Sequence, residues 1–379
     1  MLRGATGAAF LAASPSSSLT LGPGEWRGAF LALRSFLRRN HERCCVGFLG
    51  YDLALDVEPF PVSIEDDFPQ PVLHFSAYDR ILRFPPSDEG DPPPLPRCAL
   101  RPSIPRADYE RRVLAVVEHI RAGDIFQANL TQPFTGEFGG DPRILFWRLC
   151  RESPAPFSAY LETGEGTAVI SSSPEEFLRL QGRRVRTRPI KGTRPRDPDP
   201  ARDAALLREL CESEKDLAEL AMIVDLMRND LGKVAVPGSV EVGPFPERRS
   251  FEQVHHLFAT VTAELLPRAD AVDLLLAAFP GGSISGCPKL RCLEILESLE
   301  VVRRGVFTGA IGWIGPGSEM HLNLAIRTLV HRNGLLRANA GGGITSLSDP
   351  AAEYDETLQK MAGIARALGE PIRTCGARP

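Results

Sequence analysis

Lysine is scarce in this 379-residue chain. Only five of its 44 basic residues are lysines: Lys191, Lys215, Lys233, Lys289 and Lys360. An arginine guanidinium stays protonated, whereas a lysine amine loses its proton readily when it is buried, so arginine cannot replace lysine as a nucleophile. Each lysine that remains in such a chain is therefore a candidate for a role that arginine cannot fill.

The chain also lacks an excess of charge, long apolar runs and metal-type cysteine spacing. Its net charge is -4 and no Lys/Arg-rich run stands out, so nucleic acid is not an expected partner. Every apolar run is broken by charge, proline or glycine, which excludes a membrane-spanning helix. The eight cysteines are scattered without CxxC or zinc-type spacing, and we expect reduced thiols in a cytoplasmic protein.

Proline is concentrated between residues 84 and 106, and this stretch predicts an extended linker. It divides the chain into an N-terminal subregion, 1–105, and a main domain, 106–370. The longest helical pattern covers 204–231. Because strand-like and helix-like segments are mixed without regular alternation, we expect an α+β fold with mixed or antiparallel sheets and flanking helices.

Two predicted helices each carry a pair of acids spaced by three, Asp216 with Glu219 and Glu353 with Glu356. This spacing puts each pair on one helix face. If the two faces meet, the carboxylates form an oxygen-rich cluster that suits Mg²⁺ and leaves positions open for water or substrate. The alternative is ordinary solvated acids, with Glu356 and Lys360 as an i,i+4 ion pair.

Two glycine-rich segments, PGGSISGCPK at 280–289 and ANAGGG at 338–343, have neither the GxxxxGK[ST] nor the GxGxxG form. Their backbone N–H groups are free to approach an anion, and Arg327 and Lys289 would supply positive charge for a carboxylate. The alternative is that these glycines form tight hairpins.

Three further side chains are candidates for acid–base or nucleophilic chemistry. Lys191 in RPIKGTRPR lies between an apolar residue and glycine, where partial burial favours the neutral, nucleophilic amine; a surface lysine in a turn is the alternative. Glu175 in SSSPEEF is a candidate general acid, or a helix-start glutamate after proline. His255 and His256 in VHHLFATV alternate across a predicted strand, so at most one of them faces a given site.

The order of these segments carries more information than any one of them. The chain resembles the chorismate-utilising enzymes, which include anthranilate, aminodeoxychorismate, isochorismate and salicylate synthases, through SSSPE, RPIKGTRPR, ELAMIVDLMRNDLGKVAVPGSVEV, VHHL, FPGGSISGCPKLR, FTGAIGW, LNLAIRTL, AGGGI and EYDETLQKM. The likeness covers about residues 106–366. It implies that 106–370 is an α+β catalytic domain that binds chorismate in a deep cleft, with the ring carboxylate on Mg²⁺.

The resemblance also implies roles for individual residues. Glu175 matches the general acid that assists loss of the C4 hydroxyl, and His256 matches the active-site histidine. The metal-binding acids of the family match Glu219 and Glu356, with Asp216 and Glu353 close behind. The positions that bind the substrate match Arg327, Gly341, Gly342, Gly343, Ser285 and Lys360. Trp313 stands where the family often has tyrosine.

Two positions distinguish the branches of the family. In isochorismate and salicylate synthases a lysine that activates water occupies the place of Gln127, so glutamine here implies ammonia as the nucleophile. Anthranilate synthases usually have PIAGT where this chain has PIKGT, and the lysine is typical of the branch that aminates C4. The resemblance implies that Lys191 attacks C2 of chorismate as the C4 hydroxyl leaves. Ammonia would then bond to C4 and release the lysine from C2 to give 4-amino-4-deoxychorismate, on the way to p-aminobenzoate and folate.

Ammonia requires a source, and no cysteine occurs in a nucleophile context such as GxCxG. We therefore expect a separate glutamine amidotransferase subunit as partner and a separate lyase that releases p-aminobenzoate. The alternatives are an anthranilate-forming enzyme and a non-catalytic sensor that binds chorismate. The opening residues contain no clear counterpart of the Leu-Leu-x-Ser segment that lines a tryptophan pocket in some members.

Overall fold

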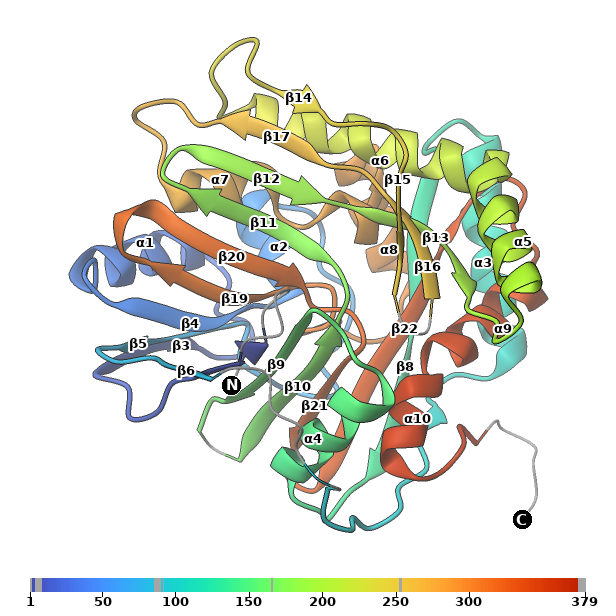
Figure 1. Cartoon of the computed structure of the whole chain (residues 1–379), viewed down its shortest axis with the longest axis horizontal. Coiled ribbons are helices and arrows are strands. Elements are labelled where there is room, and N and C mark those ends of the chain that lie inside the picture. Colours follow the sequence, from blue (N-terminus) through green and yellow to red (C-terminus); the bar gives the residue numbers. More distant parts are fainter. Residues whose placement is uncertain are drawn as a thin grey trace.

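The computed structural model of the chain describes residues 2–3, 9–84, 90, 92–164, 166–251 and 254–373. Two large antiparallel sheets and one small sheet form its centre (Figure 1). The ten-stranded sheet consists, in spatial order, of β18 (Gly286–Cys287), β8 (Gln127–Glu137), β22 (Leu335–Ile344), β21 (Thr328–Arg332), β10 (Thr167–Ser173), β9 (Phe157–Glu162), β1 (Leu2–Arg3), β2 (Ala9–Leu11) and β6 (Leu82–Phe84), with β7 (Arg101–Pro102) paired to β8. The nine-stranded sheet consists of β14 (Glu241–Val242), β17 (Val261–Glu264), β12 (Arg184–Arg188), β11 (Glu176–Gln181), β20 (Glu319–Leu324), β19 (Ala310–Gly315), β4 (Cys44–Leu49), β5 (Leu73–Tyr78) and β3 (Ser17–Leu21). The small sheet consists of β13 (Ile190–Pro195), β16 (Val254–Phe258) and β15 (Glu247–Ser250).

Helices cover the outer faces of these sheets. They are α1 (Ala29–Arg39), α2 (Ala54–Val57), α3 (Arg106–Arg121), α4 (Pro142–Glu152), α5 (Pro200–Glu212), α6 (Glu214–Gly232), α7 (Ala271–Ala278), α8 (Lys289–Leu299), α9 (Pro350–Lys360) and α10 (Ala362–Leu368), together with the short 3-10 turns η1 (Tyr51–Leu53), η2 (Gly282–Ile284) and η3 (Pro316–Ser318). The apolar faces of α1, α6 and α7 pack on the nine-stranded sheet, and those of α4 and α10 pack on the ten-stranded sheet. The expected α+β fold with antiparallel sheets and flanking helices is confirmed. No described helix is long and apolar enough to cross a membrane.

The two large sheets pack face to face. Buried residues of β4 and β19 from one sheet and of β9, β10 and β21 from the other form one apolar cluster between them. Strand β10 is therefore buried along its whole length, including its three serines. Ser173 Oγ donates a hydrogen bond to Leu324 O at 2.6 Å, which satisfies its buried hydroxyl and fixes the end of β10 next to Glu175.

Strands from the two predicted parts of the chain complete the same sheets. Strand β1 pairs with β9, and β4 pairs with β19. Residues 92–100, within the predicted linker, form no helix or strand. The N-terminal subregion thus supplies edge and central strands to sheets that also contain the predicted main domain.

The helix predicted over 204–231 is two helices, and the prediction of one continuous helix is wrong. The break falls at Ser213, whose backbone is extended and whose Oγ accepts a hydrogen bond from Asp216 N at 3.3 Å. A serine followed by an acid three residues later is a helix-start signal that outweighs continuous apolar periodicity. The break separates α5 from the helix that carries Glu219.

Candidate active site

Lys191 lies on β13, where the strand bulges at Gly192. Pairing with β16 shifts register between Lys191 and Thr193, and Gly192 has a φ of 77°, a left-handed conformation that favours glycine. A Cβ at this position would also lie 2.9 Å from Leu210 Cδ1. The side chain of Lys191 is only 13% exposed, and its Nζ lies 3.7 Å from Glu219 Oε2 on α6. The structure therefore holds a largely buried amine beside a largely buried carboxylate.

Strand β22 approaches this amine closely because residue 343 is glycine. A Cβ on Gly343 would lie 3.3 Å from Lys191 Nζ and 1.9 Å from Gln127 Nε2. Gln127 itself is only 1% exposed, and within the described residues its Oε1 is buried without a hydrogen-bond partner. Since a buried acceptor without a partner is costly, Gln127 is a candidate for contact with a bound ligand. Figure 1 shows β13, β16 and β22 beside one another, near α5, α6 and α9.

Glu175 is a buried carboxyl near Lys191. It lies two residues after the end of β10, is 5% exposed, and its Oε1 accepts a hydrogen bond from Ser283 Oγ at 2.8 Å. Burial raises its pKa to about 7, although the Ser283 hydrogen bond and the charge of Lys191 act in the opposite direction. A substantial fraction of this carboxyl therefore carries a proton at neutral pH, as a general acid requires.

The two adjacent histidines of β16 face opposite ways, as predicted. His255 Nε2 lies 2.9 Å from Asp203 Oδ1, on the α5 side. His256 Nδ1 lies 2.9 Å from Thr193 Oγ1, and burial together with the charge of Arg327 lowers its pKa to about 4. His256 is thus neutral at physiological pH and is the member of the pair that lies with the candidate site.

Arg327 lies close to His256 and has an unusual backbone. Its φ of 50° is left-handed, and its carbonyl accepts a hydrogen bond from Ser172 N at 3.0 Å. Burial lowers the pKa of its guanidinium. Within the described part of the chain no carboxylate or carbonyl is bonded to that guanidinium, so it remains available for an anionic ligand.

The four predicted metal-binding acids fall into two groups. Glu353 and Glu356 lie together on α9. Glu353 is 5% exposed, accepts a hydrogen bond from Ser348 Oγ at 2.7 Å, and has a second oxygen, Oε2, that is buried without a described partner. A Cβ on Gly342 would lie 2.7 Å from that oxygen. Burial, with the charge of Glu356, raises the pKa of Glu353.

The acids of α6 are paired with cations, Asp216 with Arg194 at 3.3 Å and Glu219 with Lys191. Among the residues that the structure describes, no three His, Cys, Asp or Glu side chains form a group that could hold a metal ion. Although burial acts to raise the pKa of Glu356, the charges of Lys360 and, more weakly, Lys191 lower it overall. Lys191 therefore lies within electrostatic range of acids from both helices.

The three glycines Gly341–Gly343 lie inside β22 and not in a hairpin turn, so the hairpin alternative is wrong for this segment. They pair with Asn129–Thr131 of β8. No described strand pairs with them on their other side, and there Lys360 Nζ donates a hydrogen bond to Gly341 O at 2.6 Å and lies 2.6 Å from Glu356 Oε1. This free strand edge and its lysine are suited to binding a carboxylate.

In the other glycine-rich segment, 280–289, the side chains of Ser285 and Lys289 bond to neighbouring protein groups. Ser285 is fully buried, and its Oγ donates to Gly281 O within the same turn at 2.9 Å. Lys289, which was expected to supply charge for a carboxylate, lies 2.6 Å from the buried Asp230 Oδ2, and that expectation is wrong. Sequence reasoning missed three hydroxyl residues that bond to candidate residues: Ser283 to Glu175, Thr193 to His256 and Ser348 to Glu353. Of these, Ser283 lies within the PGGSISGCPK motif already identified.

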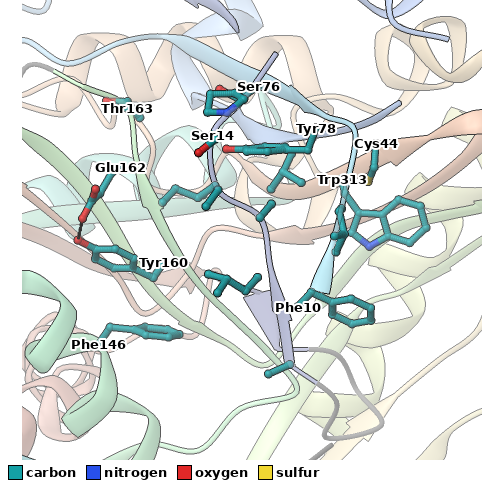
Figure 2. A pocket seen from close by; sticks show the side chains of 18 of the residues that line it. Phe10, Ser14, Cys44, Ser76, Tyr78, Phe146, Tyr160, Glu162, Thr163 and Trp313 are labelled. Atoms are coloured by element: carbon teal, nitrogen blue, oxygen red, sulfur yellow. Dashed lines mark hydrogen bonds between the residues drawn. The ribbon is translucent and has the colours of Figure 1, made fainter. Parts of the chain in front are cut away.

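Trp313 does not join the other predicted site residues. It lines a separate cavity of about 1410 Å³ whose walls contain none of them. Figure 2 shows Phe10, Tyr78 and Trp313 around this space, with Tyr160 and its hydrogen-bonded partner Glu162 across it. The N-terminal strands β2, β4 and β5 supply much of the wall, so the cavity could not be recognised from a local motif.

Comparisons with known proteins identify the family of this chain. The family described as chorismate binding enzyme matches residues 9–366. Aminodeoxychorismate synthase component 1 of Klebsiella aerogenes is 40% identical over 346 residues, which cover 85% of this chain and 76% of that protein. Anthranilate synthase component 1 of Streptomyces coelicolor is 43% identical over 266 residues, which cover 70% and 52%.

A solved structure extends the likeness to three dimensions. Anthranilate synthase component I from Streptococcus pneumoniae TIGR4 superposes with a TM-score of 0.83 at 28% identity, covering 94% of this chain and 92% of that one. The family match spans almost the whole of the described chain and includes both groups of acids, the glycine edge and Lys191. This chain therefore belongs to the family of chorismate binding enzymes.

Proposed function

We propose that the chain is the component of aminodeoxychorismate synthase that converts chorismate and ammonia to 4-amino-4-deoxychorismate. The observation that carries the proposal is the burial of Lys191 between Glu219, Gln127 and the protonatable Glu175. A buried amine next to a carboxyl that is protonated near neutrality combines a nucleophile with a general acid. The name of the 40% identical Klebsiella aerogenes protein supports the same assignment.

The proposed chemistry has two substitutions at the chorismate ring. In the first, neutral Lys191 Nζ bonds to C2, the two ring double bonds shift towards C4, and the C4–O bond breaks. Glu175 gives its proton to the departing hydroxyl, which leaves as water. In the second, ammonia bonds to C4, the double bonds shift back, and the C2–N bond to Lys191 breaks, which restores the neutral amine. The proton that ammonia sheds returns to Glu175.

The remaining site residues bind and orient the substrate in this proposal. The guanidinium of Arg327 and the strand edge of Gly341–Gly343 bind its carboxylates, supported by Lys360. His256, which is neutral because of its low pKa, donates or accepts a hydrogen bond without adding charge. Gln127, with its unpartnered Oε1, accepts a hydrogen bond from ammonia.

We propose Mg²⁺ as the ion that the carboxylates of this site hold. Glu353 Oε2 is buried without a described partner, and Mg²⁺ commonly binds to proteins through only one or two carboxylates while keeping water and substrate oxygens. Glu356 and Glu219 would be its nearest ligands, with Glu353 and Asp216 behind them. When bound, the ion supplies positive charge that holds the ring carboxylate of chorismate.

Glu356→Gln is expected to weaken Mg²⁺ binding by about 10- to 100-fold, because the substitution removes a charged oxygen ligand. Isothermal titration calorimetry with MgCl₂ alone measures the affinity. Asp355→Asn is the matched control, since Asp355 lies on the same helix but pairs with Arg106 at 2.9 Å, away from the acid group. The same loss of Mg²⁺ affinity in both variants would contradict the assignment of Glu356, and so would an unchanged affinity in Glu356→Gln.

We further propose that a separate glutamine amidotransferase subunit supplies the ammonia and that a separate lyase forms p-aminobenzoate. The designation of the relatives as component 1 supports a partner subunit. A cytoplasmic location is supported by free thiols at Cys44, Cys45, Cys98, Cys211, Cys287 and Cys292.

The direct test is product identification from the purified chain with chorismate, Mg²⁺ and an ammonium salt at mildly alkaline pH. The expected product is 4-amino-4-deoxychorismate, which becomes p-aminobenzoate in a parallel tube that contains the lyase. Anthranilate would favour the second candidate, which the 43% identity to an anthranilate synthase component supports. Binding of chorismate without turnover, even with added amidotransferase, would identify a sensor instead.

A further inference from the structure

Ser283 connects the glycine-rich turn of residues 280–286 to the buried carboxyl of Glu175. Its hydroxyl is the side-chain donor to Glu175, at 2.8 Å from Oε1, and the residue is only 8% exposed. The two residues are more than a hundred positions apart in the chain. Ser283 therefore belongs to neither the strand nor the local turn that carries the acid.

The turn that presents Ser283 is held tightly on both sides. A Cβ on Gly281 would lie 2.8 Å from Leu324 Cδ2, and one on Gly282 would lie 2.5 Å from Leu226 Cδ2 of α6. A side chain at either position would force Leu324 or Leu226 to move. The Ser285 hydroxyl closes the turn through its hydrogen bond to Gly281 O at 2.9 Å. The Ser283 hydroxyl is thus fixed relative to β20 and to the helix that carries Glu219.

We propose, on the basis of the function proposed above, that Ser283 is the positioning residue for Glu175 and holds its carboxyl in the orientation that delivers a proton to the leaving C4 hydroxyl. The hydrogen bond occupies Oε1, so the proton that is transferred resides on the other oxygen. The backbone N–H of Ile190 also bonds to this carboxyl. Without the serine it is the remaining hydrogen-bond donor, so the orientation of the carboxyl is less closely fixed and its two oxygens compete for the proton. Ser283 does not touch the reacting atoms and acts only through Glu175.

The hydrogen bond has a second, measurable effect. A hydrogen bond to the ionised form lowers the pKa of a carboxyl, so its removal is expected to raise the pKa of Glu175 above its value of about 7. The size expected for loss of one hydrogen bond to a charged group is about one pH unit. Because only the protonated acid is active, the alkaline limb of the pH–rate profile should move upward by the same amount.

The test compares the full-length chain with its Ser283→Ala variant in two measurements. In the chorismate assay, kcat at the optimum is expected to fall about 10-fold with KM within two-fold, and the alkaline limb is expected to rise. In infrared difference titration, the carboxyl band of Glu175, identified by its absence in Glu175→Gln, is expected to titrate about one pH unit higher. Ser283→Thr, which keeps the hydroxyl, is expected to restore both values towards those of the wild type. Ser283→Cys, of similar size but a weaker donor, replaces the alanine variant if that variant does not fold.

Ser285→Ala is the matched control within the same turn. It removes the hydrogen bond to Gly281 O but keeps the Ser283 hydroxyl, and Gly281 and Gly282 still pack against Leu324 and Leu226. The contact with Glu175 should therefore remain, and the alkaline limb is expected to stay in place even if the rate falls. An unchanged kcat or an unchanged Glu175 titration in Ser283→Ala would overturn the proposal. Failure of the proposed function is a separate result, in which wild-type protein forms no aminated product; the infrared titration still decides the Ser283–Glu175 contact in that case.

Discussion

Alanine in place of Lys191 is expected to lower kcat by about 10³-fold or more and to abolish the covalent adduct with the chorismate ring. Two other described lysines lie near the acids of the site. Lys360 is held by Glu356 and Gly341, and Lys215 acts on the charges of Glu353 and Glu356, whereas Lys191 is the lysine found beside both Gly343 and Glu219. The adduct is measured by mass spectrometry of protein quenched with chorismate and Mg²⁺ in the absence of ammonia. Its expected mass is that of the chain plus chorismate less one water.

Lys191→Arg separates nucleophilicity from charge in this experiment. Arginine keeps a cation near Glu219, so folding and the balance of charge around the acids should be retained better than in the alanine variant. A guanidinium does not attack the ring, and the adduct should therefore be absent from both variants. An adduct of undiminished yield in either variant would show that another residue, or none, bonds to the substrate.

Glutamine in place of Glu175 is expected to lower kcat by about 10²- to 10⁴-fold, the range typical of a lost general acid. The wild-type rate should fall as the pH rises through about 7, because Glu175 loses its proton there. The glutamine side chain does not titrate, so the alkaline limb near pH 7 should disappear in the variant. The pH dependence of kcat/KM measures both effects.

The neighbouring acid provides the control. Glu176 is as buried as Glu175 but faces Arg186 and His321, at 2.8 and 2.9 Å. Although burial acts to raise its pKa, hydrogen bonds from His321 and Arg186 lower it to about 2. Glu176→Gln is therefore expected to lower the stability of the fold while retaining the limb near pH 7. Persistence of that limb in Glu175→Gln would remove Glu175 from the role of general acid.

The sequence was sufficient for features that depend on local periodicity. The alternation of His255 and His256 across β16 and the shared face of Glu353 and Glu356 follow from the geometry of strands and helices. The α+β class followed from the irregular mixture of elements. In both residue pairs the two members lie within three positions of one another, so local backbone geometry is enough.

Features that depend on distant contacts could not be predicted. Nothing near Ser283 in the sequence indicates that it bonds to Glu175, and nothing near Lys289 indicates Asp230. The AGGG segment has the composition of a turn, yet it forms a strand that pairs with β8. Its glycines leave room for the side chains of Gln127 and Lys191 next to the backbone. Trp313 occupies a position expected of the substrate site, but the N-terminal strands place it in the wall of another cavity.

The sharing of sheets between the two ends of the chain has a consequence for its synthesis. Leu49 of β4 pairs with Ala310 of β19, so most of the protein must leave the ribosome before this central strand gains its partner on that side. Until then the nascent chain exposes buried-type residues such as Phe48 and Leu49. Such long-range pairing slows folding and prolongs the exposure of aggregation-prone strands, which makes a chaperone-assisted, largely post-translational folding route the expected one for this protein.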